Sequence, residues 1–164
     1  MRFALLEHYG GTWIDSTVYL TEPLPNTILN SDFFAVRNSL LLIDNPVLYP
    51  AWLLHAKKEN KTIREIRNVA FSYWLKNEHV IEYLLPNLII TLVVKSNLEV
   101  EKAIPYMNSD YSEYLVKVLA DDYSEEKWNW IKKLTGIHKL TYKLSPDIEA
   151  EGTFYKALIE NSIE

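Results

Sequence analysis

The residues best suited to chemistry lie in one short stretch near the start of the chain. Gly10 and Gly11 are adjacent, although the 164 residues include only 4 glycines, and adjacent glycines permit the left-handed backbone that ends a helix. Residues 12–14, which are β-branched or aromatic, predict a short buried strand. The strand delivers the Asp15 carboxylate and the Thr17 hydroxyl at its edge, where open α/β sheets bind ligands. Oxygen groups of this kind suit Mg²⁺ or Mn²⁺ carrying a diphosphate.

Residues 9–18, with the sequence Tyr-Gly-Gly-Thr-Trp-Ile-Asp-Ser-Thr-Val, resemble the signature of the capsular polysaccharide synthesis proteins. These are relatives of the sugar transferases that carry an Asp-x-Asp motif after Tyr-Gly-Gly. Three later segments agree with the family in order and kind, namely residues 73–74, 82–84 and 137–143. The resemblance therefore extends over roughly residues 2 to 143. It implies a partial nucleotide-sugar transferase fold of the GT-A-like type, α/β and helix-rich, with a small N-terminal sheet and a helical C-terminal half.

The resemblance also implies a catalytic residue, a donor-binding group and a metal site. Asp15 is the implied catalytic residue and contacts the donor ribose or the metal. The donor-binding residues implied are Gly10, Gly11, Asp15, Thr17, His138 and Lys139. The metal, Mn²⁺ or Mg²⁺, would be held by Asp15, Thr17 and His138. Thr17 stands where the family motif has its second Asp, and its neutral hydroxyl is a weaker ligand than a carboxylate.

His138 follows Gly136, which we expect to end a helix, so we expect His138 on a turn or short extended segment that projects into a cleft. An imidazole there would suit Mn²⁺ or a phosphate oxygen, and Lys139 and Lys143 would neutralise a departing diphosphate. On this interpretation, His138→Ala weakens ligand binding more than it weakens the fold. The alternative is that His138 satisfies backbone carbonyls and that both lysines are solvated.

Composition limits the classes of function. The chain is 48% hydrophobic and 24% charged, which predicts one globular domain over residues 1–164. Its net charge of −5, with scattered Lys and Arg, argues against a nucleic-acid partner. The absence of cysteine excludes disulfides, thiol catalysis and thiolate metal sites, and is compatible with a reducing cytoplasm.

Periodicity and capping signals predict a helix-rich body. The strands expected after the first are residues 33–36 and 40–43, and the helices expected are residues 51–58, 62–77, 83–94, 111–119 and a last one that starts at Ser124 and is closed by Gly136. Thr62 and Glu65 have capping-box spacing, and Pro86 fits the first turn of its helix. The apolar run over residues 83–94 is too short to span a membrane, which takes roughly 20 residues.

Other chemical groups leave alternatives open. Asp32 and Asp44 follow expected strands and are candidate acceptor contacts, or are simply solvated. Trp13 lies two residues before Asp15, on the same side of a strand, so it either shapes the site or buttresses it. The remaining tryptophans follow helical patterns, which favours core positions over sugar stacking.

The predicted function is transfer of a sugar from a nucleoside-diphosphate sugar to a capsular or surface glycan, with retention of anomeric configuration as the resemblance implies. The alternative is a noncatalytic remnant or accessory subunit that keeps the fold without binding donor. A cytoplasmic location at the inner face of the membrane, with peripheral association, is expected because a capsule enzyme must reach lipid-linked acceptors. Only 14 residues precede Asp15, so we expect the chain to be the C-terminal portion of a catalytic domain, weakly active alone and prone to self-association.

Overall fold

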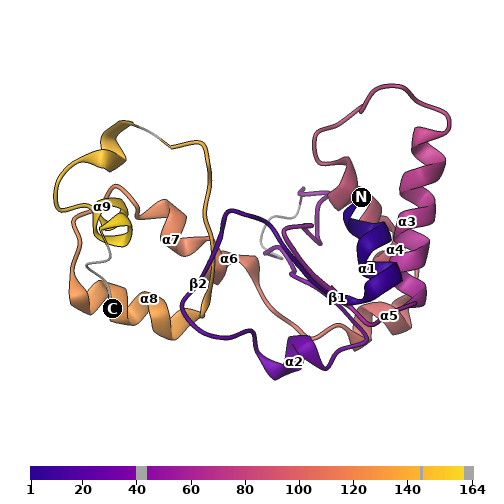
Figure 1. Cartoon of the computed structure of the whole chain (residues 1–164), viewed down its shortest axis with the longest axis horizontal. Helices are drawn as coiled ribbons and strands as arrows, with labels where there is room; N and C mark the ends of the chain where they lie inside the picture. Colours follow the sequence, from indigo (N-terminus) through magenta and orange to yellow (C-terminus); the bar gives the residue numbers. More distant parts are fainter. Residues whose placement is uncertain (40–43, 145, 161–164) are drawn as a thin grey trace. The chain divides into compact units, whose positions relative to one another are not determined.

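The computed structural model describes residues 1–39, 44–144 and 146–160. The chain forms two compact units. The first contains Met1–Asp15 and Pro25–Ser109, and the second contains Ser16–Leu24 and the chain from Asp110 onwards. Both units mix helices with a small antiparallel sheet (Figure 1), which confirms the helix-rich α/β prediction.

The first unit is built on a three-stranded antiparallel sheet in the order β1-β4-β3, formed by β1 (Gly11–Ile14), β4 (Leu53–Ala56) and β3 (Phe33–Ala35). The central strand, β4, pairs Leu54 with Trp13 on one side and with Ala35 on the other. Every residue of β4 is buried, because both of its edges and both of its faces are covered. The short helix α2 (Asn26–Leu29) precedes β3.

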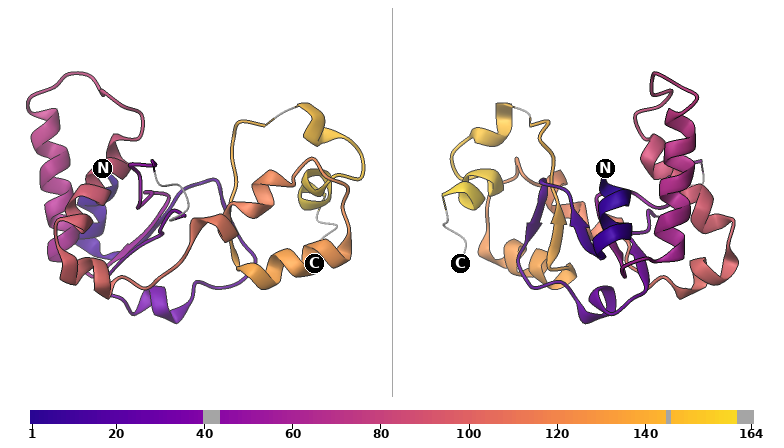
Figure 2. Two further views of the ribbon diagram at one scale, coloured as in Figure 1. Left: turned by 180° about the vertical axis from the view of Figure 1, so that it is seen from behind. Right: turned by 45° about the vertical axis from the view of Figure 1, so that its right-hand side comes forward.

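Helices pack against this sheet and bury its apolar side chains. They are α1 (Arg2–Tyr9), α3 (Lys61–Trp74), α4 (Leu85–Lys95) and α5 (Leu98–Ala103). Helix α3 packs against both α1 and α4, and the three helices lie together in both views of Figure 2. The core of the unit joins Phe3 and Leu6 of α1 to Ile63 and Ile66 of α3 and Ile90 of α4.

The structure corrects two of the expected elements in this unit. Residues 51–58 were expected to be helical, but residues 53–56 form β4, because burial between two partner strands outweighs local helix propensity. The expected capping box is also wrong. Helix α3 is capped by Asn60, whose side chain accepts a hydrogen bond from the Ile63 amide. Pro86 does lie in the first turn of α4, as expected. The expected strand at 40–43 falls outside the described residues.

Gly10 lets α1 turn directly into β1. Its amide donates to the Leu6 carbonyl, its φ is 71°, and a Cβ there would lie 2.6 Å from the Lys58 backbone nitrogen. Gly11 also has a positive φ, 95°, but a Cβ there would meet no atom within 4 Å. The two glycines therefore differ in steric constraint although their backbone strain is similar.

This difference predicts unequal costs for two alanine substitutions. Gly10→Ala adds a backbone clash to left-handed strain and is expected to lower the free energy of unfolding by about 2 kcal/mol or more. Gly11→Ala adds the strain alone, about 1–2 kcal/mol. Denaturant unfolding of the two variants measures the difference. Equal losses would show that the contact with Lys58 does not constrain Gly10.

The second unit pairs β2 (Val18–Leu20) with β5 (Ile137–Lys139) in an antiparallel two-stranded sheet. Its helices are α7 (Tyr114–Lys117), α8 (Glu125–Leu134) and α9 (Phe154–Ile159), with the 3₁₀ turn η1 (Pro146–Glu149). Helix α6 (Ser109–Ser112) begins at the last residue of the first unit. The core of this unit contains Leu115, Trp128, Ile131 and Phe154.

The helix expected to start at Ser124 is confirmed as α8, with the Ser124 side chain as its N-cap, and it ends at Leu134. The expected helix at 111–119 is instead divided between α6 and α7. Gly136 does not close α8 by a left-handed turn. It is small because the Glu22 side chain packs over it, and a Cβ there would lie 2.7 Å from Glu22 Cβ. No described helix has the length and apolarity needed to cross a membrane.

Candidate functional site

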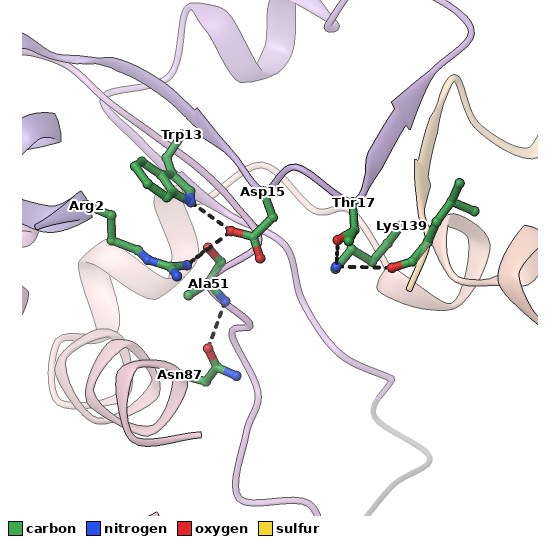
Figure 3. A network of polar contacts seen from close by, with 8 residues as sticks. Arg2, Trp13, Asp15, Thr17, Ala51, Asn87 and Lys139 are labelled. Carbon is green, nitrogen blue, oxygen red and sulfur yellow. Dashed lines mark hydrogen bonds and ion pairs between the residues drawn. The ribbon is translucent and has the colours of Figure 1, made fainter. Parts of the chain in front are cut away.

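Asp15 follows β1 directly and its backbone is fixed by the sheet. Its amide donates to the Trp52 carbonyl at 2.9 Å. Its side chain is held by two donors at one oxygen, since Oδ1 accepts from Trp13 Nε1 at 2.9 Å and lies 3.4 Å from Arg2 NH1. Figure 3 shows both donors converging on that oxygen. The other oxygen, Oδ2, makes no hydrogen bond within the described residues, and the side chain is 31% exposed.

Arg2 is itself fixed from several directions. Its guanidinium donates to the Ala51 carbonyl at 2.8 Å and lies 5.0 Å from the centre of the Trp13 ring. The amide of Ala51 donates in turn to Asn87 Oδ1 on α4 at 3.1 Å. This network, drawn in Figure 3, joins α1, β1, the segment before β4 and α4. Because both donors to Asp15 are restrained, the carboxylate keeps one orientation with Oδ2 directed away from them.

Thr17 and Lys139 are brought together within the second unit. The β2–β5 pairing sets Val18 opposite Lys139, and the Leu140 amide donates to the Thr17 carbonyl at 2.8 Å. Lys139 Nζ donates to Thr17 Oγ1 and, at 3.2 Å, to the Leu140 carbonyl. Both side chains are half-buried. The contact is visible in Figure 3, where the ammonium group lies against the Thr17 hydroxyl.

His138 lies in the interior of the second unit. The expectation that it projects into a cleft is wrong, because β5 carries its side chain into the core, where it is 0% exposed. Its Nε2 lies 3.2 Å from Thr21 Oγ1, and its ring packs between Tyr19 and Trp128. Burial lowers the pKa of His138 to about 4, so the ring is neutral at neutral pH. Its Nδ1 is buried without a hydrogen-bond partner among the described residues, and the ring offers no nitrogen to a ligand at the surface.

The three predicted metal ligands, Asp15, Thr17 and His138, have different surroundings. Thr17 Oγ1 accepts from an ammonium group, Asp15 lies beside a guanidinium, and His138 is fully buried. The described part of the chain contains no group of three or more His, Cys, Asp or Glu side chains placed to hold a metal ion. Asp15 Oδ2 makes no hydrogen bond within the described residues, and Mg²⁺ in proteins is often held by one or two carboxylates together with substrate phosphates and water. A metal role for Asp15 stays a prediction.

The other predicted residues differ in what their surroundings permit. Gly10 is close to the backbone of Lys58, which explains the glycine structurally, whereas Gly11 is exposed with open space beside it. Asp32 is exposed and forms an ion pair with Lys57 at 2.6 Å. Asp44 lies in an exposed turn. A role for Gly11 toward donor, or for either acid toward acceptor, stays a prediction.

Arg2 is the residue of the Asp15 network that sequence reasoning missed. No spacing rule connects a helical arginine at position 2 with a strand carboxylate at position 15. The role of Trp13 was left open, although its spacing of two residues from Asp15 placed both side chains on one side of the strand. In the structure Trp13 contacts Asp15 directly, because its indole Nε1 donates a hydrogen bond to Asp15 Oδ1.

One comparison with known proteins identifies a family. A family model described as "Capsular polysaccharide synthesis protein" matches residues 1–158. No curated protein and no solved structure matches the chain.

Proposed function

Because the chain belongs to the capsular polysaccharide synthesis protein family, we propose that its role in that synthesis is transfer of a sugar from a nucleoside-diphosphate sugar to a capsular or surface glycan. The observation that carries the proposal is the Asp15 carboxylate, which is fixed at Oδ1 by Trp13 and Arg2 and uncommitted at Oδ2. A carboxylate that is held rigidly and left one free oxygen is suited to orienting a hydroxyl group.

In the proposed reaction the bond between the anomeric carbon and the diphosphate oxygen breaks. An acceptor hydroxyl oxygen forms the new glycosidic bond, the nucleoside diphosphate leaves with the electron pair, and the leaving diphosphate oxygen takes up the proton of the hydroxyl. Asp15 Oδ2 accepts a hydrogen bond from a hydroxyl of the donor and holds the sugar in place. Retention of configuration, a GT-A-like architecture and a location at the inner face of the membrane belong to the proposal through the family resemblance.

A binding panel tests the proposal directly. The 164-residue chain is titrated calorimetrically with UDP, GDP, CDP and their glucose or mannose conjugates, both with Mn²⁺ and with a chelator. Saturable binding of one nucleotide series, followed by release of its diphosphate when a glycan acceptor is added, is the expected result. If none of these nucleotides binds to folded protein under either condition, the proposed transfer is wrong and the accessory-subunit alternative is favoured.

Trp13→Phe tests whether the indole N–H acts through Asp15. The variant keeps an aromatic ring beside Arg2 but removes one hydrogen bond to a carboxylate, so donor affinity or turnover is expected to fall about 10-fold. Trp74→Phe, at an exposed tryptophan on α3, is the matched control and is expected to change neither quantity.

A double-mutant cycle separates positioning from general loss of structure. If Trp13 acts only through the charge of Asp15, Trp13→Phe has little further effect in an Asp15→Asn background. Additive losses of donor affinity in the double variant would show that Trp13 acts independently of Asp15.

A further inference from the structure

We propose that Thr17 and Lys139 form a direct phosphate contact, so that the chain binds the diphosphate of its donor without a divalent cation at the second position of the motif. This inference rests on the proposed function, because it names the groups that recognise the donor. The supporting observation is that Lys139 Nζ contacts Thr17 Oγ1. A positively charged side chain therefore lies at the motif position where the family resemblance implies a metal-binding acid.

The contact disfavours a metal ion at Thr17 for two reasons. The hydroxyl oxygen already accepts a hydrogen bond from the ammonium group, so one of its lone pairs is occupied. A divalent cation bound to the same oxygen would lie within a few ångströms of a second positive charge, and like charges at that separation repel strongly in a half-buried environment. A carboxylate at position 17 would offset this repulsion, whereas a threonine does not.

The same geometry favours binding of an anion to Lys139. Lys139 Nζ has three donor hydrogens, and its hydrogen-bond partners among the described residues are two neutral oxygens, Thr17 Oγ1 and the Leu140 carbonyl. No carboxylate of the described chain lies within ion-pair distance of Lys139. An ammonium group with a third donor hydrogen and an uncompensated charge is a common phosphate ligand.

Glu113 is an acidic residue whose charge interacts with that of Lys139. Burial raises the pKa of Glu113, and the charges of Lys117 and Lys139 lower it in part. Its electrostatic effect on Lys139 is weaker than that of a contacting carboxylate, because the two groups form no ion pair. The β2–β5 pairing fixes the backbone of Lys139, and the Leu140 amide donates to the Thr17 carbonyl. The phosphate contact is therefore preorganised by the chain rather than by a bound ion.

The first position of the motif follows the same pattern inside the other unit. Asp15 lies beside the Arg2 guanidinium, at 3.4 Å from NH1. Within its own unit, each of the two motif positions therefore has a basic side chain as its neighbour.

Calorimetric titration of the full chain with inorganic pyrophosphate and with UDP tests the proposal, each in EDTA and in Mn²⁺. Pyrophosphate is expected to bind in EDTA, and Lys139→Met is expected to weaken it about tenfold or more, with partial rescue in Lys139→Arg. Lys133→Met removes the same charge from the exposed face of α8 and is expected to have less than about a twofold effect, consistent with weak surface electrostatics. Thermal unfolding confirms that each variant is folded.

Thr17→Asp gives a second, independent variant. Its carboxylate would pair with Lys139, so pyrophosphate binding in EDTA is expected to weaken and binding in Mn²⁺ to become stronger than in EDTA. A folded Thr17→Asp variant that binds pyrophosphate as the unmodified chain does, in both conditions, would contradict the assigned role of Lys139.

The outcomes separate this inference from the proposed function. UDP binding that requires Mn²⁺ and is unchanged in Lys139→Met overturns the metal-free contact and leaves sugar transfer standing. Pyrophosphate binding that depends on Lys139, with no binding of any nucleotide sugar, supports the contact and overturns the transfer. Absence of pyrophosphate binding to the folded chain in EDTA overturns the contact, and the transfer is overturned as well only if UDP, GDP, CDP and their sugar conjugates also fail to bind.

Discussion

Replacing Asp15 with asparagine is expected to lower sugar transfer about 100-fold or more, while changing the free energy of unfolding by less than about 1 kcal/mol. Asparagine keeps the size of the side chain and an oxygen that accepts from the Trp13 indole. It loses the negative charge that pairs with Arg2 and that strengthens any hydrogen bond accepted by Oδ2. The stability cost is small because the Asp15–Arg2 pair is partly exposed and its distance of 3.4 Å is long.

The comparison requires a carboxylate elsewhere on the same unit as control. Glu99 is exposed and paired with Lys102, so Glu99→Gln removes the same charge away from the network around Asp15. Initial rates of transfer with saturating donor, together with denaturant unfolding curves, measure both effects. Full activity in Asp15→Asn, under conditions where the unmodified chain transfers sugar, would remove Asp15 from the mechanism.

Local signals in the sequence were sufficient to predict the helix and strand that precede Asp15. A helix closed by Gly10 and followed by a β-branched and aromatic strand is a pattern of nearest neighbours, and the structure reproduces it as α1 and β1. The same holds for α8, where Ser124 and the acidic first turn mark the start. Such signals depend on residues within one helical turn of each other, so one sequence contains all of the information needed.

Elements decided by tertiary burial were not predictable in this way. Residues 53–56 contain no strong strand former, yet they form the central strand because β1 and β3 satisfy their backbone groups on both sides. The sheet is antiparallel, so the expectation that a ligand lies at the edge of an open α/β sheet, which derives from parallel sheets, does not apply here. The placement of Asp15 rests instead on its contacts with Trp13 and Arg2.

The site itself was predictable only in part for the same reason. Asp15 and Thr17 were identified from one continuous motif, but their partners lie far along the chain or in another element. Thr17 contacts Lys139 across 122 positions of sequence, and the strand pairing that joins them has no local signature. His138 was given a ligand role because nothing in the sequence shows that Trp128 and Tyr19 enclose its ring.

The buried position of His138 predicts that acid destabilises the chain. The pKa of His138 is lowered by burial to about 4, against an ordinary value of 6.5 in the unfolded chain. The neutral ring therefore contributes stability that is fully present above about pH 6.5 and is lost as the pH falls from about 6.5 toward about 4. The pKa difference corresponds to a loss of about 3 kcal/mol over that range. Denaturant unfolding at a series of pH values between these limits measures it.

His138→Gln isolates the contribution of this ring, because glutamine is polar and does not titrate. The difference in unfolding free energy between the unmodified chain and the variant is expected to shrink as the pH falls. In acid, the His138 ring of the unfolded chain is protonated, so folding of the unmodified chain must either remove that proton or bury the charge, whereas glutamine imposes neither cost. Burial and the charge of Lys57 also lower the pKa of His55, so some acid sensitivity remains in the variant. His79→Gln, at an exposed histidine, is the control and should follow the unmodified curve. Parallel curves for the unmodified chain and His138→Gln would mean that His138 does not titrate with unfolding and that its enclosure by Trp128 and Tyr19 does not hold in solution.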